Sequence, residues 1–232
     1  MIYAALLAGG VGNRIGADTP KQFVLLDGRP LLAHCIDKFI KVECLDEIIV
    51  SSPKECIKQT NKVVEEYFPR VNNIIVIQGG ETRECTIMNS ISYIEDNTDF
   101  NDNPIVATHD AARIFVSPNQ IKKSILYAKT HGASAPIIPS NDVMVKSLDG
   151  TNIHSMPDRN QLFHVQTPQT FHVHEYKKLY ESLSEDEKEE VKEAVKVFYL
   201  HKKDIYLFKG ENNNFKITTP FDLKIAESII KS

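Results

Sequence analysis

The sequence predicts an α/β fold in which a mostly parallel β-sheet is covered by helices on both faces. The first reason is an alternation: short apolar runs bounded by turn residues are separated by longer segments with apolar residues at helical spacing. The second is that polar residues cluster directly after two of these runs, which end at Ala8 and Thr108. Because ligands of parallel sheets bind at the carboxyl ends of strands, both clusters are expected at the ligand-binding edge of the sheet.

Six short apolar runs are expected to form the strands, since each is bounded by turn or polar residues. They are residues 2–8, 47–51, 73–77, 104–108, 133–138 and 205–209.

The helices are predicted from apolar stripes and from residues that favour helix starts. Pro30 and Pro118 suit a first helical turn. Ser184 followed by Glu187 suits a capping box in an acidic, Lys-rich segment that is expected to present a solvated helix face. The expected helices are residues 31–40, 54–67, a segment from 82 or 83 to 94, 118–130, 183–199 and a last one opened by Thr219-Pro220.

From residue 139 the alternation stops, and a hairpin is expected instead. Residues 143–147 and 152–156 flank Asp149-Gly150, and Asp-Gly is typical of tight hairpin turns. A lone hairpin is marginal in water. This arm, at about residues 139–160, is therefore expected to pack on a partner subunit or to fold over the site.

Composition and charge exclude several classes of protein. The 232 residues carry 31 acids and 27 bases, a net charge of −4, with no long basic run, so duplex nucleic acid is not an expected partner. No apolar stretch reaches the roughly 18 residues that cross a bilayer, and no basic segment precedes the first apolar run.

The four cysteines form no C-x-x-C pair, which favours reduced thiols in the cytoplasm. Without repeats or a linker, the chain is expected to form a single domain over 1–232.

The segment Gly9-Gly10-Val11-Gly12-Asn13-Arg14-Ile15-Gly16 follows the first strand, and glycines there allow backbone N–H groups to close around phosphate oxygens. A dinucleotide fingerprint needs a third glycine where Ile15 stands, and a Walker loop needs Gly-Lys, which is absent. The third interpretation adds the cations Arg14 and Lys21, so that backbone and side chains surround one triphosphate. A plain tight turn with two surface cations is the simpler alternative.

The loop from Leu7 to Arg14, followed by Pro20-Lys21-Gln22, resembles the signature loop of sugar-nucleotide-type nucleotidyltransferases. The resemblance continues in register over nearly the whole chain. The further matching segments are Gly79-Gly80-Glu81-Thr82-Arg83 with Thr86, His109-Asp110-Ala111-Ala112-Arg113, Asp158-Arg159-Asn160, Gln166-Thr167-Pro168-Gln169-Thr170-Phe171 and Asn214-Phe215-Lys216-Ile217-Thr218-Thr219. Together they resemble most closely the cytidylyltransferases of polyol phosphates, which act on methylerythritol 4-phosphate or ribitol 5-phosphate.

This resemblance implies a Rossmann-like fold of the nucleotide-diphospho-sugar transferase type and the reaction of CTP with a polyol phosphate to give a CDP-polyol and pyrophosphate. It also implies Mg²⁺ as the divalent cation and a homodimer formed through the β-arm. A phosphate monoester is largely dianionic at neutral pH, so it needs no general base to attack the α-phosphorus. Such chemistry requires positioning and neutralisation of phosphate charge.

The resemblance also implies roles for individual residues. Arg14 and Lys21 would be catalytic on the pyrophosphate side, and Lys216 at the α-phosphate. Asp110 would be a magnesium ligand or an acceptor for substrate hydroxyls. The nucleotide-binding residues would be Leu7, Ala8, Gly9, Gly10, Gly12, Arg14, Lys21, Gly80, Arg83, Thr86 and Ala111. The substrate-binding residues would be Asp110, Arg113, Arg159, Thr167 and Lys216. The simpler alternatives are surface ion pairs for the arginines and local backbone hydrogen bonds for the threonines.

Departures from the family pattern bear on the polyol. The opening Leu-Ala-Gly-Gly is closer to the ribitol type, whereas Ala111-Ala112 is nearer the methylerythritol type. Ile114 stands where both usually carry Pro, Val143 replaces a Thr, and Lys192-Glu193 replaces Thr-Asp. The sequence favours ribitol 5-phosphate, with methylerythritol 4-phosphate as the alternative. A nicotinamide-dependent oxidoreductase and a non-catalytic nucleotide-binding protein are the rival functions.

Overall fold

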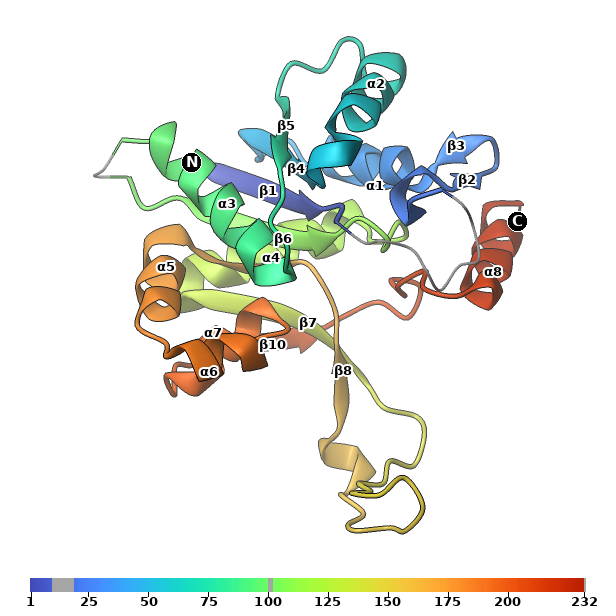
Figure 1. Ribbon diagram of the computed structural model, residues 1–232, viewed down its shortest axis with the longest axis vertical. Helices are drawn as coiled ribbons and strands as arrows, with labels where there is room; N and C mark the ends of the chain where they lie inside the picture. The colour runs from blue at the N-terminus through green and yellow to red at the C-terminus, as the bar shows by residue number, and fades with distance from the viewer. Residues whose placement is uncertain (10–18, 100–101, 232) are drawn as a thin grey trace.

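The computed structural model describes residues 1–9, 19–99 and 102–231. A sheet of eight strands runs through its centre and has helices on both faces (Figure 1). The strands are β1 (Ile2–Leu7), β4 (Glu47–Ser52), β5 (Ile74–Gln78), β6 (Ile105–Asp110), β7 (Ala133–Pro139), β8 (Phe163–Val165), β9 (Gln169–His172) and β10 (Tyr206–Lys209). A separate two-stranded sheet pairs β2 (Leu25–Leu26) with β3 (Arg29–Pro30).

The strand order is β10-β7-β9-β6-β1-β4-β5, with β8 pairing beside β7. The β1–β4, β1–β6, β4–β5 and β7–β10 pairs are parallel, so the predicted mostly parallel sheet is confirmed. The sequence did not predict β9, which runs antiparallel between β6 and β7, nor β8. β9 was missed because its residues, Gln-Thr-Phe-His, lack an apolar run; the two neighbouring strands and the helices over them bury it.

Five of the eight described α-helices lie close to their predicted positions. They are α1 (Leu31–Phe39), α2 (Ile57–Tyr67), α3 (Arg83–Asp96), α4 (Pro118–His131), α5 (Val173–Glu181), α6 (Glu185–Glu190), α7 (Ala194–Leu200) and α8 (Pro220–Lys231), with short 3₁₀ turns η1 (Lys21–Phe23), η2 (Lys54–Cys56) and η3 (Arg159–Gln161). α5 was not predicted from the sequence.

The alternation of β1 shows why both faces of the sheet need helices. Ala4 and Leu6 point into a core shared with α1, α2 and α4, whereas Tyr3 and Ala5 point into a second core under α3, α5 and α7. All four side chains are fully buried. Since each large apolar side chain gains about 1.5–3 kcal/mol on burial, a strand that is apolar on both faces is stable only between two helical layers.

The predicted single helix over 183–199 is wrong, because two helices occupy this segment. α6 begins with the predicted capping box, in which Ser184 and Glu187 bond reciprocally, but the chain leaves the helical conformation at Val191. Val191 and Phe198 are each 1% exposed, so the segment is drawn onto the second core instead of presenting a solvated face throughout. The break leaves Glu193 in an extended conformation immediately before α7.

Residues 140–162 form a protrusion below the sheet, which we call the arm (Figure 1). Its base is the antiparallel pairing of β7 with β8, and farther out a single bridge joins Lys146 to Ser155. The expected strands at 143–147 and 152–156 are therefore wrong, although Asp149 does hold the turn by accepting the N–H groups of Thr151 and Asn152. The arm has too few cross-strand pairs and no core of its own to support regular strands.

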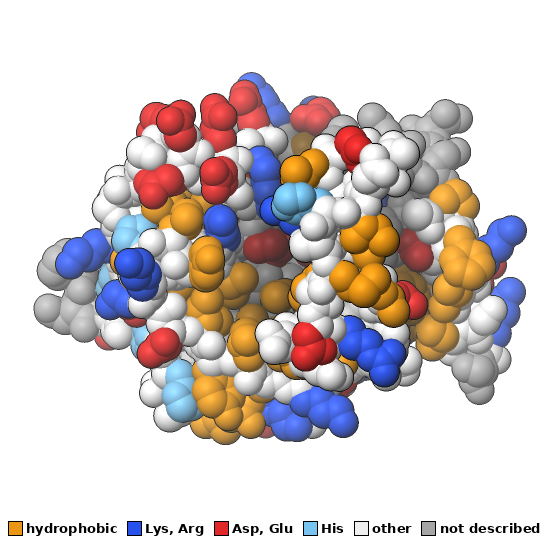
Figure 2. Space-filling model, turned by 90° about the horizontal axis from the view of Figure 1, so that it is seen from below, with side chains coloured by type: hydrophobic (Ala, Val, Ile, Leu, Met, Phe, Trp, Pro, Cys, Tyr) orange, Lys and Arg blue, Asp and Glu red, His pale blue; other side chains and the backbone are white. Residues whose placement is uncertain are grey.

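The arm exposes many apolar side chains. Figure 2 shows the molecule from the end that carries the arm, and hydrophobic side chains gather on this face. Val143, Leu148, Ile153 and Met156 are 61–73% exposed.

Over the described ranges, none of the helices combines the length and apolarity that a bilayer crossing requires.

Candidate active site

A cavity of about 430 Å³ opens where β1, β5 and β6 end, at the carboxyl edge of the parallel strands. This is the edge at which the sequence predicted a ligand site. The described residues that line it are Leu7, Ala8, Gly9, Lys21, Gln22, Leu31, Gly80, Glu81, Thr82, Arg83, Thr86, Asp110, Ala111, Ala112, Lys216 and Thr218.

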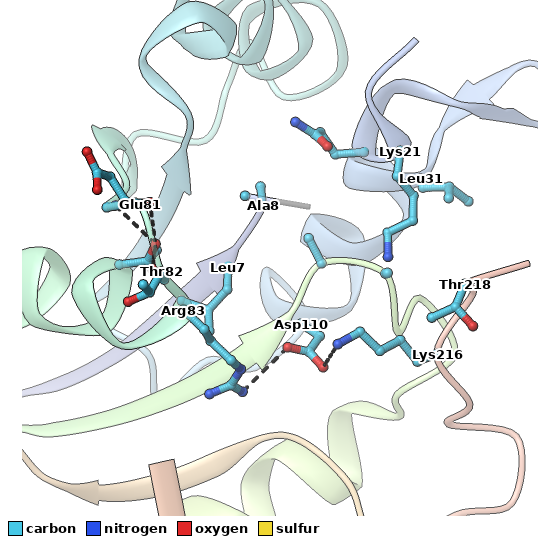
Figure 3. Close-up of a pocket in the computed structure, with 16 residues that line it drawn as sticks. Leu7, Ala8, Lys21, Leu31, Glu81, Thr82, Arg83, Asp110, Lys216 and Thr218 are labelled. Atoms are coloured by element: carbon cyan, nitrogen blue, oxygen red, sulfur yellow. Dashed lines mark hydrogen bonds and ion pairs between the residues drawn. The ribbon is translucent and has the colours of Figure 1, made fainter. Parts of the chain in front are cut away.

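Asp110, the last residue of β6, is the electrostatic centre of this cavity. Lys216 Nζ lies 2.9 Å from its Oδ2, and Arg83 Nη2 lies 3.4 Å from its Oδ1 (Figure 3). Arg113 Nε lies 3.5 Å from Oδ2. Burial raises the pKa of the Asp110 carboxyl, but Arg83, Lys216 and Arg113 outweigh it and hold that pKa well below its usual range. Asp110 is therefore an anion enclosed by three cations.

The start of α3 shapes the wall opposite Lys216. Thr82 caps the helix by accepting the N–H of Cys85, which directs Arg83 toward Asp110. Gly80 packs so closely that an added Cβ would lie 2.3 Å from the Cβ of Cys85. The hydroxyl of Thr86 donates to the carbonyl of Thr82 at 2.8 Å and accepts the N–H of Gly80 at 3.0 Å. Thr86 thus fixes the Gly80 backbone at the edge of the cavity.

A buried polar layer supports Asp110 from behind. His109 Nε2 lies 3.0 Å from the carbonyl oxygen of Arg113, and its Nδ1 lies 2.8 Å from Thr167 Oγ1. Because a carbonyl only accepts, Nε2 carries the proton and Nδ1 accepts the Thr167 hydroxyl. Thr167 Oγ1 in turn accepts the backbone N–H of Asp110 at 3.3 Å. Thr167 therefore connects the neutral imidazole to the backbone of Asp110.

Lys216 reaches the site because its loop is tied to the same layer. Asn214 is fully buried and donates from Nδ2 to the carbonyl of Thr167 at 2.8 Å, while its own carbonyl accepts Arg113 Nη1 at 2.8 Å. The N–H of Ile217 bonds the carbonyl of Ala112 at 3.0 Å. These bonds place a lysine about a hundred residues distant in sequence against Asp110.

The buried imidazole predicts a pH dependence of stability. Burial lowers the pKa of His109 to about 4, whereas an unfolded histidine titrates near 6.5. The unfolded state thus binds the proton more readily, so the stabilisation is complete above about pH 6.5 and is lost as the pH falls toward 4. The shift corresponds to about 3 kcal/mol. We expect the free energy of unfolding, measured in urea between pH 4 and 8, to fall with falling pH more steeply in the parent chain than in His109→Gln. Equal slopes would contradict the assignment of His109 as a buried neutral imidazole.

The sequence matches a known protein family over almost its whole length. The family model described as IspD, 2-C-methyl-D-erythritol 4-phosphate cytidylyltransferase, matches residues 2–232. The chain belongs to this cytidylyltransferase family.

Solved structures share the fold of this IspD-family chain. It resembles 4-diphosphocytidyl-2C-methyl-D-erythritol synthase from Anaerococcus prevotii over 100% of this chain and 99% of that one, with 24% identity and a TM-score of 0.82. The 2-C-methyl-D-erythritol 4-phosphate cytidylyltransferase of Thermus thermophilus gives 23% identity, full coverage of both chains and a TM-score of 0.75. The 2-C-methyl-D-erythritol 4-phosphate cytidylyltransferase of Francisella tularensis is 24% identical over 98% of each chain, with a TM-score of 0.78.

Most of the predicted site residues meet in the one cavity. Those that line it are Leu7, Ala8, Gly9, Lys21, Gly80, Arg83, Thr86, Asp110, Ala111 and Lys216. The amine of Lys21 is directed into the cavity (Figure 3). Arg113 and Thr167 stand behind Asp110. Arg159 lies in the arm, at the start of η3, apart from the described lining of this cavity. Gly10, Gly12 and Arg14 lie outside the described residues.

Four residues for which the sequence predicted no role belong to the network of contacts around this cavity. They are His109, Gln169, Glu193 and Asn214. Three of them stand inside the matching motifs, so the signal was present, but a motif does not say which side chains bond one another. Glu193 was noted only as a departure from the family pattern.

Proposed function

We propose that this protein transfers a cytidylyl group from CTP to 2-C-methyl-D-erythritol 4-phosphate and releases pyrophosphate. The observation that carries the proposal is the family match over residues 2–232 combined with cations from three distant segments, Lys21, Arg83 and Lys216, around one cavity. Such a cavity suits a polyanionic ligand.

The chemistry follows from charge. An oxygen of the acceptor's phosphate forms a bond to the α-phosphorus of CTP, and the bond from that phosphorus to the bridging oxygen breaks, so pyrophosphate departs. The attacking phosphate is already largely dianionic and gives up no proton to a protein base. The protein must hold two anions together and stabilise the charge on the leaving group. Lys216 would serve at the α-phosphate and Lys21 at the pyrophosphate.

A second cavity of about 300 Å³ offers a place for the polyol phosphate, because it shares Lys216 with the first. Its described lining residues are Arg113, Ile138, His164, Val165, Gln166, Asn212, Phe215 and Lys216. A phosphate beside Arg113 and Lys216 would thus lie next to the α-phosphate of a nucleotide in the larger cavity.

Magnesium fits the site as an ion carried by the nucleotide. Within the described part of the chain, no three His, Cys, Asp or Glu side chains are grouped to hold a metal. The central carboxylate, Asp110, is already balanced by three cations. Mg²⁺ commonly binds through one or two carboxylates and substrate phosphates. The phosphates of CTP would therefore be the main ligands of the ion, which would help to neutralise their charge.

We also propose a homodimer through the arm, with Arg159 of the arm contributing to the partner's substrate phosphate site. The support is the exposed apolar surface of the arm, which protrudes below the sheet (Figure 1), and the position of Arg159 outside the described lining of the chain's own cavity. Sedimentation of the purified chain tests the dimer.

The four cysteines are unbonded thiols, in keeping with a cytoplasmic enzyme.

Ribitol 5-phosphate is the second candidate acceptor. The opening Leu7-Ala8-Gly9 followed by Gly10 and the segment 208–219 are closer to the ribitol enzymes in sequence. The family match supports the methylerythritol substrate better.

A pyrophosphate-release assay decides between them. The purified chain is incubated with CTP and Mg²⁺ and with each of methylerythritol 4-phosphate, ribitol 5-phosphate, glycerol 3-phosphate and arabinitol phosphate. We expect release that requires both CTP and methylerythritol 4-phosphate. Release of pyrophosphate with CTP and ribitol 5-phosphate, but with none of the other acceptors, would identify ribitol 5-phosphate as the acceptor. Equal rates with ATP or UTP would contradict the choice of CTP, and no release with any acceptor would contradict the transferase.

A further inference from the structure

Arg83 is shared between two carboxylates. Its Nη2 lies 3.4 Å from Asp110 Oδ1 and also 3.4 Å from Glu193 Oε2. The side chain is 17% exposed, and its buried Nε and Nη1 have no hydrogen-bond partner within the described part of the chain. The orientation of this guanidinium therefore depends on two competing contacts through one nitrogen.

Both contacts of Arg83 are long for a charged pair. A guanidinium that pairs freely with a carboxylate closes to about 2.7–2.9 Å and often bonds through two nitrogens. Here Lys216 already occupies Asp110 Oδ2 at 2.9 Å. Among the residues that the structure describes, Oδ1 meets only the loosely held Arg83, so this oxygen keeps room to accept a further hydrogen bond from a ligand.

Glu193 is itself held in place by a buried amide. Gln169, 1% exposed on β9, donates from Nε2 to Glu193 Oε2 at 2.7 Å and accepts the N–H of Val195 at 3.1 Å through Oε1. One side chain thus ties both Glu193 and the first turn of α7 to the sheet. The break between α6 and α7 leaves Glu193 in the extended conformation that this contact requires.

We propose that Glu193 is a positioning residue that holds Arg83 back from Asp110, so that Asp110 Oδ1 remains open to a hydroxyl group of the polyol phosphate. The inference rests on the proposed function and names one acceptor atom for that substrate. Without the negative charge of Glu193, Arg83 closes on Asp110 and occupies Oδ1. The polyol hydroxyl must then displace a charge-assisted hydrogen bond before it binds.

Three variants separate charge from packing. Glu193→Gln removes the charge but keeps an oxygen that accepts Gln169. Glu193→Asp keeps the charge on a shorter side chain. The control is Glu190→Gln, which removes a negative charge only three residues away, from a side chain that is 69% exposed and paired with Lys196 at 3.7 Å.

Steady-state kinetics give the first measurement. For Glu193→Gln we expect the KM for the polyol phosphate to rise about 10-fold, with the KM for CTP and the melting temperature unchanged. Glu193→Asp should recover part of the loss, and Glu190→Gln should match the parent. A polyol KM within twofold of the parent in Glu193→Gln would overturn the proposal. So would an equal rise in both KM values together with a lower melting temperature, which indicates a purely structural role.

A second measurement needs no substrate. In protein labelled with ¹³C-carboxyl aspartate, the Asp110 signal is assigned by its loss in Asp110→Asn. Glu193→Gln should move this signal and Glu190→Gln should not; an unmoved signal would overturn the proposal. If the parent chain turns over no polyol phosphate, the proposed function fails and this signal alone decides on Glu193. If the parent is active and Glu193→Gln behaves like it in both measurements, the positioning role fails and the proposed function stands.

Discussion

Lys216→Ala is expected to lower the kcat of cytidylyl transfer by at least about 100-fold, the usual effect of removing one preorganised donor from a developing negative charge. Lys216 lines both cavities and contacts Asp110, and no other amine among the described lining residues serves both cavities. The fold should survive, since the side chain is 37% exposed and Asp110 keeps Arg83 and Arg113.

Pyrophosphate release under saturating CTP and acceptor measures this effect. Lys209→Ala is the matched control, because Lys209 is an exposed lysine on β10, seven residues before Lys216. Its activity should equal that of the parent. If Lys216→Ala retained more than a tenth of the parental kcat with an unchanged melting temperature, the assignment of Lys216 to the transferred phosphate would be wrong.

Asp110→Asn is expected to abolish most activity and also to destabilise the fold at pH 7 by about 3 kcal/mol, because three cations lose the buried anion that balances them. Activity falls because Arg83 and Lys216 lose the group that orients them. Urea unfolding gives the stability and the pyrophosphate assay gives the activity. Asp186→Asn, on exposed α6, is the control.

The loss of stability in Asp110→Asn is also expected to depend on pH. The folded-state pKa of Asp110 lies below its unfolded value, which is ordinarily near 3.9. The ionised carboxylate therefore stabilises the fold fully at pH values above the unfolded-state pKa. This stabilisation is lost as the pH falls below the unfolded-state pKa and through the folded-state pKa. The stability difference between the parent and Asp110→Asn should be complete at pH 7 and shrink below about pH 4. A difference that is constant over this range would show that Asp110 acts by shape and not by charge.

Local pattern was sufficient for much of the fold and for part of the site. The apolar alternation of β1 and the stripes of α1 and α3 predict their own elements, because burial of these side chains depends on spacing along the chain. The polar clusters after Ala8 and Thr108 follow predicted strands, so the edge of the sheet that carries the cavity was also predictable.

Tertiary contacts decided what spacing does not encode. β9 has no apolar run and becomes a strand because β6 and β7 supply partners on both sides. The helix expected over 183–199 breaks because burial of Val191 outweighs helix continuity.

The sequence by itself determined the layered architecture, the edge of the sheet that carries the cavity, and the family motifs, because these depend on residue types at short spacing. Only the tertiary structure decided that Asp110 is enclosed by Arg83, Arg113 and Lys216, and that Glu193 contacts Arg83. The physical reason is that ion pairing depends on distances of a few ångströms between segments up to about a hundred residues apart, which the packing of the sheet and the loop of Asn214 bring together.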